Sequence, residues 1–126
     1  MTFRKMIFDE FIFDEWFSGY ARYEDVDFTY RVGRKYEMYV VAEAKVEHFN
    51  KPENLTLSFG LGKMEVINRL YFVKKNRDLS LALCYWALCG ILLNNVIKGI
   101  LCFDKRCMHM AKGNISGLIH SLSLFL

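Results

Sequence analysis

The chain has 126 residues, a length that suits one small domain or part of a larger one. Hydrophobic residues make up 53% of it and charged residues 25%, which excludes an intrinsically disordered chain. The net charge of +3 is too small to indicate nucleic-acid binding, so no nucleic-acid partner is expected. Residues 79–126 contain four Lys and Arg but only one acid, Asp104. A charged first section is therefore followed by an apolar, mildly basic second section.

The first section contains three predicted elements and a loop. Residues 6–13 predict a short helix, and the aromatic residues 14–23 predict a loop. Residues 24–35 begin with acids and end with basic residues, an order that favours a helix, although their apolar residues also alternate as in a strand. Residues 38–48 give the clearest strand pattern. Its core-facing residues are predicted to be Val40, Ala42, Ala44 and Val46.

The second section predicts three helices. Residues 55–76 have a helical apolar pattern and a basic end, and residues 111–126 predict a last helix. Residues 79–103 are apolar nearly all round and approach the roughly 20 residues that span a bilayer. Because Asn94, Asn95 and Lys98 interrupt this segment, a buried or membrane-surface helix is favoured over a clean span.

The candidate chemistry lies in the acids Glu24, Asp25 and Asp27, which follow the aromatic loop. Transfer of a group to an alcohol requires a carboxylate that takes the hydroxyl proton, and nearby aromatic rings can stack on a sugar. The alternative, which the spacing alone favours, is an acidic helix N-terminus stabilised by the helix dipole. Asp25 and Asp27 would not share a helix face, which makes them a poor metal clamp. Arg31 is placed to pair with Asp27 or to reach back to the loop.

Two further residue types suggest metal binding only weakly. His48 ends the predicted strand and is a tentative metal or phosphate ligand, but a hydrogen-bonded histidine at a strand end is the favoured interpretation. The cysteines form two Cys-x4-Cys pairs, which lack the spacing of a zinc site, so free thiols are expected. These cysteines are Cys84, Cys89, Cys102 and Cys107.

An ordered series of motifs over about residues 1–77 resembles the second half of a family-2 glycosyltransferase with a GT-A fold. The matching segments are Met1–Arg4, Phe13–Glu15, Glu24–Asp27, Arg31, Glu43–His48 and Leu70–Arg77. The resemblance implies an α/β fragment, in which residues 1–54 form a partial GT-A domain with a small sheet, the acceptor-side half. Residues 55–126 would be a helical C-terminal extension associated with a membrane. The donor-binding half would precede Met1, so the chain alone is expected to be inactive.

The resemblance also implies an activity and roles for the site residues. The enzyme would transfer a sugar, with inversion, from a nucleotide-sugar donor to a glycan or lipid-linked acceptor. Asp25 would be the catalytic base and Glu24 would support the acceptor, while Trp16 and Tyr23 would contact the acceptor sugar. A divalent Mg or Mn ion would be held mostly by the missing half. His48 would lie near the metal and diphosphate, and Asp27 and Arg31 would be structural or diphosphate-contacting residues.

The same resemblance implies partners and a location. A half-domain would leave an exposed sheet edge, which favours pairing with a second copy, so a homo-oligomer is expected. The location would be the cytoplasm or the cytoplasmic face of a membrane, with contact to the membrane surface. Two other functions remain open: a non-enzymatic, membrane-associated helical protein, and a small interaction module that binds through its aromatic loop.

Overall fold

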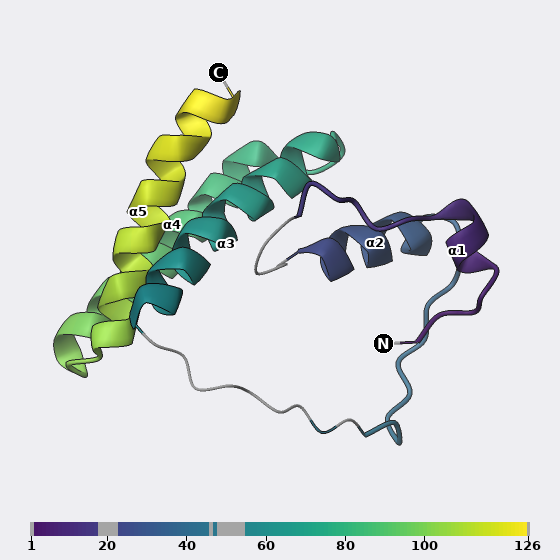
Figure 1. Cartoon of the computed structure of the whole chain (residues 1–126), viewed down its shortest axis with the longest axis horizontal. Helices are drawn as coiled ribbons and strands as arrows, with labels where there is room; N and C mark the ends of the chain where they lie inside the picture. The colour runs from purple at the N-terminus through teal and green to yellow at the C-terminus, as the bar shows by residue number, and fades with distance from the viewer. Residues whose placement is uncertain (1, 18–22, 46, 48–54, 126) are drawn as a thin grey trace. The chain divides into compact units, whose positions relative to one another are not determined.

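The computed structural model describes residues 2–17, 23–45, 47 and 55–125, and these form two compact units, Met1–Pro52 (unit 1) and Glu53–Leu126 (unit 2). Unit 1 contains two helices and unit 2 contains three among the described residues (Figure 1). The helices are α1 (Ile7–Glu10), α2 (Glu24–Gly33), α3 (Leu55–Lys75), α4 (Leu81–Leu101) and α5 (Lys105–Phe125).

The predicted α/β fragment with a small sheet is wrong, because the described residues form helices and no strand. Residues 38–45 and 47 are not β-structure, Val40 is fully exposed, and Ala42 and Ala44 are also exposed. Val46 and His48 lie outside the described residues. The physical reason is that a strand makes its hydrogen bonds to a neighbour, and the described part of unit 1 provides no second strand. The expected pairing of sheet edges between copies therefore loses its basis.

The core of unit 1 is built around Phe28, which α2 places at 0% exposure. Ile7 of α1 and Val32 of α2 are buried with it. Three further rings surround Phe28, with centroid separations of 4.3, 4.9 and 5.6 Å for Phe13, Phe3 and Phe8 respectively. This aromatic cluster fixes α2 against the segment that precedes it, and so sets the direction of the acids in its first turn.

In unit 2, α3, α4 and α5 run side by side, joined by short turns (Figure 1). The contact between α3 and α5 is the most extensive. Ser80 begins α4 as an N-cap, since its Oγ accepts a hydrogen bond of 3.3 Å from the Leu83 N–H. The side-chain amide of Asn76 donates to the Phe72 carbonyl, 2.8 Å away, where α3 ends.

Glycines allow α3 and α5 to approach at backbone distance. A Cβ added to Gly113 of α5 would lie 2.2 Å from the Phe59 carbonyl oxygen of α3, and one added to Gly62 of α3 would lie 2.3 Å from the Met110 oxygen. A Cβ at Gly117 would lie 2.7 Å from the Lys63 oxygen. Along α5, Gly113 meets Phe59 and Lys63 and the later Gly117 meets Lys63 and Val66, so α3 and α5 run parallel. Such close packing through small residues is typical of helices in membranes.

Candidate functional site

The acids that the sequence singles out all lie in the first turn of α2. This confirms the predicted helix over residues 24–35 and rejects the alternating-strand alternative for that segment. Tyr23 precedes the helix with a φ of 82°, a left-handed conformation that is rare for a bulky residue. Local strain of this kind concentrates at functional sites and turns. It holds Tyr23, the predicted acceptor contact, directly beside Glu24.

Asp27 and Arg31 form a buried structural pair. The Arg31 Nε donates to Oδ2 of Asp27 over 2.8 Å, and the Asp27 side chain has no exposed surface. The Nη2 of Arg31 also donates to the Ile12 carbonyl, 2.7 Å away. The predicted pairing of Arg31 with Asp27 is therefore confirmed, and the second contact of Arg31 goes to Ile12, which precedes the predicted loop at 14–23. The pair attaches α2 to the chain in front of it.

Asp25 points away from this pair, as the two-residue spacing predicts. Its side chain is exposed, and its Oδ1 accepts a 2.8 Å hydrogen bond from the Val26 N–H. Asp25 also lines an open hollow on α2 together with Val26, Thr29 and Tyr30. That hydrogen bond supports the helix-terminus interpretation, since the carboxylate accepts from the first turn. Asp25 is one of the four residues that line this hollow, whose surface is mostly apolar, and its side chain is open to solvent.

Glu24 is half-buried beside Asp25. Its Oε2 is a buried oxygen to which no described residue donates a hydrogen bond. A carboxylate oxygen without a donor accepts readily from a hydroxyl. This oxygen is enclosed by the protein, so Asp25 is the exposed carboxylate of the two.

Trp16 lies in the loop between the two helices of unit 1, with 38% of its surface exposed. Its ring meets the buried ring of Phe17 edge to face, at a centroid separation of 5.7 Å. The backbone N–H of Trp16 donates to Oδ1 of Asp14 over 3.0 Å. The Phe17 ring is therefore packed beneath the loop, while the neighbouring Trp16 ring remains accessible to a ligand.

The metal expected from the resemblance finds no matching ligand set in the part of the chain that the structure describes. No group of three or more His, Cys, Asp or Glu side chains comes together there. Asp27 forms an ion pair with Arg31, and the exposed Asp25 points away from that pair. His48 lies outside the described residues. The described residues do not fit a divalent ion, and no chemical step is assigned to one.

A buried polar contact in unit 2 was not predicted from the sequence. The Nδ2 of Asn95 in α4 donates to Oδ1 of Asn114 in α5 over 3.0 Å, and Nδ2 of Asn114 donates to the Gly62 carbonyl of α3 over 2.8 Å. These two bonds link all three helices through the interior. The apolar pattern around 79–103 indicated only that Asn95 interrupts it. A signal was present in the two glycines of α5 and in the asparagine that follows the first of them, since such residues suit close, polar helix contacts.

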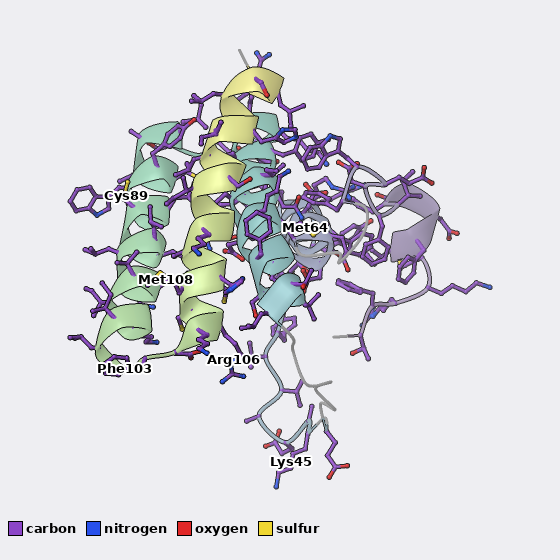
Figure 2. The ribbon with its side chains drawn as sticks, turned by 60° about the vertical axis from the view of Figure 1, so that its left-hand side comes forward. Lys45, Met64, Cys89, Phe103, Arg106 and Met108 are labelled. Carbon is purple, nitrogen blue, oxygen red and sulfur yellow. The ribbon has the colours of Figure 1, made fainter. Side chains whose placement is uncertain are left out.

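The outer surface of unit 2 is unusually apolar along α4. α4 is long and apolar enough to cross a membrane, judged by length and composition, and only 17% of its most apolar window is buried within the unit. Its 21 residues extend about 31 Å at 1.5 Å per residue, close to the roughly 30 Å of a bilayer's hydrocarbon core. Figure 2 shows Cys89 on this helix, Phe103 in the connection that follows it and Arg106 in the first turn of α5. Phe103 is 88% exposed.

Comparisons with protein-family models, curated proteins and solved structures found no match to this chain.

Proposed function

We propose that the chain is the acceptor-side and membrane-attached part of an inverting glycosyltransferase. Unit 1 would carry the acceptor site and unit 2 the membrane attachment. The observation that carries the proposal is the different placement of two nearby acids on α2: Asp27 is buried against Arg31, while Asp25 faces an open hollow. One acid thus maintains the local structure and leaves the other available for chemistry. The predicted strand plays no part in this argument.

The proposed reaction uses Asp25 as the base. The acceptor hydroxyl lies in the hollow on α2, and its oxygen attacks the anomeric carbon of a nucleotide sugar from the side opposite the diphosphate. The bond from the anomeric carbon to the diphosphate oxygen breaks with its electron pair, and the hydroxyl proton passes to Asp25. Glu24, the half-buried acid next to Asp25 in the same turn, would support the acceptor. The donor is bound by a further domain, as the resemblance implies.

Activity is tested in a fusion of the full chain with the donor-binding domain of a family-2 glycosyltransferase. Transfer of radiolabelled sugar to an array of glycan acceptors is measured for the fusion and its variants. Asp25→Asn is expected to lower the rate about 10²–10⁴-fold while acceptor binding survives, because the amide cannot take a proton. Asp9→Asn, which removes an exposed acid of α1, is the matched control. Transfer that stays within a few-fold in Asp25→Asn would reject Asp25 as the base.

The membrane part of the proposal rests on α4. Its exposed apolar side chains are stable in hydrocarbon, whereas in water they form an exposed patch of the kind that marks an interaction site. Lys98 lies in the last turn, and its long side chain can place the ammonium group among the lipid headgroups. Unit 1 would lie at the cytoplasmic face, the location that the resemblance implies.

Tryptophan fluorescence tests the membrane attachment separately from catalysis. Trp86 of α4 is 80% exposed, and a Trp16→Phe variant leaves it as the single tryptophan. Mixing this variant with phosphatidylcholine vesicles is expected to shift its emission to shorter wavelength and to protect it from a water-soluble quencher. The converse variant, Trp86→Phe, reports Trp16 of unit 1 and is expected to remain quenchable. Unchanged quenching of Trp86 in vesicles would contradict membrane attachment.

A second candidate function is a non-enzymatic membrane-associated helical protein. The same exposed surface of α4 favours it, and this function requires no chemistry in unit 1. The two candidates separate in the experiments above. A non-enzymatic protein gives membrane insertion of Trp86 but no transfer in the fusion and no binding to the glycan array.

A further inference from the structure

The cations of residues 79–126 all lie between positions 98 and 112, around the connection from α4 to α5. Three of them flank that connection closely: Lys98 in the last turn of α4, and Lys105 and Arg106 in the first turn of α5. Their side chains are exposed. Together with Phe103, which lies between them in the chain, they are called here the basic end of unit 2.

Packing brings the cations of the two helices to one place. A Cβ added to Gly99 would lie 3.3 Å from the backbone nitrogen of Met108, so the end of α4 and the start of α5 approach at backbone distance. Burial raises the pKa of the Cys107 thiol, and the charges of Lys98 and Arg106 both oppose that rise. Cations from α4 and α5 thus lie around the same thiol and form one positive patch.

The single acid of residues 79–126 does not neutralise this patch. The Oδ1 of Asp104 accepts from the backbone N–H of Arg106 over 2.8 Å, and its Oδ2 accepts from the Cys107 thiol over 3.4 Å. Its carboxylate is therefore directed at the first turn of α5, with the Arg106 Nε 3.7 Å away. Among the described residues no acid pairs with Lys98 or Lys105. Three cations and one acid leave the basic end with a net charge of +2.

Phe103 lies within this charged end with 88% of its surface exposed. Its φ of 51° is left-handed, at the position after a helix where glycine is usual because a side chain is strained there. Figure 2 shows Phe103 and Arg106 at the same end of the unit. Water offers no compensation for a strained and exposed ring, whereas the boundary between lipid headgroups and hydrocarbon does.

We propose that the basic end of unit 2 binds the anionic phospholipid headgroups of a membrane, with the Phe103 ring inserted beneath them. Hydrocarbon accommodates the ring, while phosphate oxygens accept hydrogen bonds from the ammonium and guanidinium groups around it. A lipid surface is the occupant favoured by charge, and also by continuity, because the basic end adjoins the exposed apolar surface of α4, where Leu101 is 73% exposed. The inference rests on the proposed membrane attachment of α4 and adds the class of lipid.

The test compares neutral and anionic vesicles. The full chain carrying Trp16→Phe is titrated with vesicles of phosphatidylcholine alone and with vesicles that also contain phosphatidylglycerol, and Trp86 emission gives each partition coefficient. Each net cation near an anionic surface strengthens binding about fivefold, so the anionic vesicles should be preferred on the order of 10–100-fold at low salt. The preference should disappear at about 1 M salt, where the Debye length is about 3 Å.

Charge variants locate the preference on the basic end. Lys98→Gln and Lys105→Gln should each lower the preference for anionic vesicles about fivefold and leave partition into phosphatidylcholine unchanged. Asp104→Asn should raise the preference by a similar factor, because the amide oxygen still accepts from the first turn of α5 while the negative charge is lost. Lys45→Gln, which removes an exposed cation of unit 1, is the matched control and should behave as the wild type.

Phe103→Gly tests the inserted ring. Glycine relieves the left-handed backbone, so the chain should fold at least as well by helical circular dichroism. Loss of the ring should nevertheless weaken binding to both kinds of vesicle about tenfold. Undiminished binding of this variant would contradict the insertion of the ring.

Equal partition of the wild type into neutral and anionic vesicles would overturn the inference. An equal loss of preference in Lys45→Gln and Lys105→Gln would also overturn it, since overall charge would then explain the binding. In both cases binding of Trp86 to phosphatidylcholine vesicles would leave the membrane attachment standing, whereas failure to bind either kind of vesicle would reject the attachment itself.

Discussion

Arg31 holds the fully buried carboxylate of Asp27 by a 2.8 Å hydrogen bond from its Nε. The same guanidinium binds the Ile12 carbonyl, so it joins α2 to the segment after α1. Arg31→Met should therefore leave a buried carboxylate without its cation. Removing one member of a buried pair costs about 3–5 kcal/mol, and the lower end applies because Arg31 is itself 24% exposed. Urea unfolding followed by Trp16 emission in a Trp86→Phe background measures the loss.

Arg4→Met is the control for this variant, because Arg4 is an exposed cation in the same unit. Its free energy of unfolding should change by no more than about 0.5 kcal/mol. The double variant Arg31→Met with Asp27→Leu should recover part of the loss, since it removes the buried charge as well. Equal stability of Arg31→Met and Arg4→Met would show that the pair does not stabilise unit 1.

The glycine contact between α3 and α5 gives the second prediction. Gly113→Ala places a methyl group 2.2 Å from the Phe59 carbonyl oxygen, a distance that backbone movement must relieve. Overpacking of this kind costs about 1–3 kcal/mol, which exceeds the roughly 1 kcal/mol that alanine gains over glycine in a helix. Unfolding of the full chain in mixed micelles by sodium dodecyl sulfate, followed by helical circular dichroism, should show a net loss of stability.

Gly60→Ala, in the same pair of helices, should not lower the stability as Gly113→Ala does. A Cβ at Gly60 meets nothing within 4 Å, so the change adds helix propensity without a clash. Gly60→Ala should be as stable as the wild type or slightly more stable. A Gly113→Ala variant that matched it would mean that α3 and α5 do not approach as closely as described.

The helices could largely be predicted from the sequence, because the apolar period of a helix is a local property. Residues 55–76 and 79–103 were predicted as helical and became α3 and α4 with small changes at their ends. The last helix begins at Lys105 rather than near residue 111, and the apolar residues Cys107, Met108 and Ala111 of its first turns, at helical spacing, could have indicated the earlier start. The predicted strand over 38–48 was wrong for its described residues, 38–45 and 47. Alternation of apolar and polar residues favours a strand only where a neighbouring strand completes the sheet.

The site was predictable only in part. The opposite placement of Asp25 and Asp27 follows from helix geometry, and so does the pairing of Asp27 with Arg31. The contact of Arg31 with the Ile12 carbonyl was an open alternative, because spacing cannot tell which distant backbone group is within reach. The hydrogen bond between Asn95 and Asn114 depends on how two helices pack, a relationship that the periodicity of either helix does not contain.

The asparagine pair in unit 2 gives the third prediction. Asn114→Leu removes the acceptor of Asn95 and the side-chain donor to the Gly62 carbonyl. It leaves the buried Asn95 amide without its partner, which costs about 1–3 kcal/mol. Asn95→Leu should cost less, because it takes away only one bond. The double variant should lose less than the sum of the two single variants, with a coupling of about 0.5–2 kcal/mol in the same micelle unfolding measurement.

Asn94→Leu is the control, since Asn94 is the exposed neighbour of Asn95 and makes no side-chain hydrogen bond to a described residue. It should leave the monomer's unfolding free energy nearly unchanged. Strict additivity of Asn95→Leu and Asn114→Leu would contradict the hydrogen bond between them.

The fourth prediction concerns pH and the contact between α1 and the end of α2. Lys35 donates to a carboxylate oxygen of Glu10, and the Tyr36 hydroxyl donates to the other oxygen over 2.7 Å. The hydrogen bond from Lys35, followed by that from Tyr36, holds the pKa of Glu10 below its ordinary value. The bond to Glu10 raises the pKa of Lys35 above its own. Both shifts favour the charged pair in the folded chain.

The signs of these shifts define the range of pH in which the pair stabilises unit 1. The Glu10 contribution is present above the carboxyl's unfolded pKa and is lost as pH falls through the lower, folded value. The Lys35 contribution is present below the ammonium's unfolded pKa and is lost as pH rises through the higher, folded value. The ordinary pKa is about 4.3 for a Glu carboxyl and about 10.4 for a Lys ammonium, so both groups stabilise unit 1 in full between about pH 5 and 10.

Glu10→Gln should therefore flatten the loss of stability below about pH 5, measured by urea unfolding followed by Trp16 emission in a Trp86→Phe background. Asp9→Asn, the neighbouring exposed acid of α1, should keep the wild-type slope, and an unchanged slope in Glu10→Gln would show that the contact contributes nothing to folding.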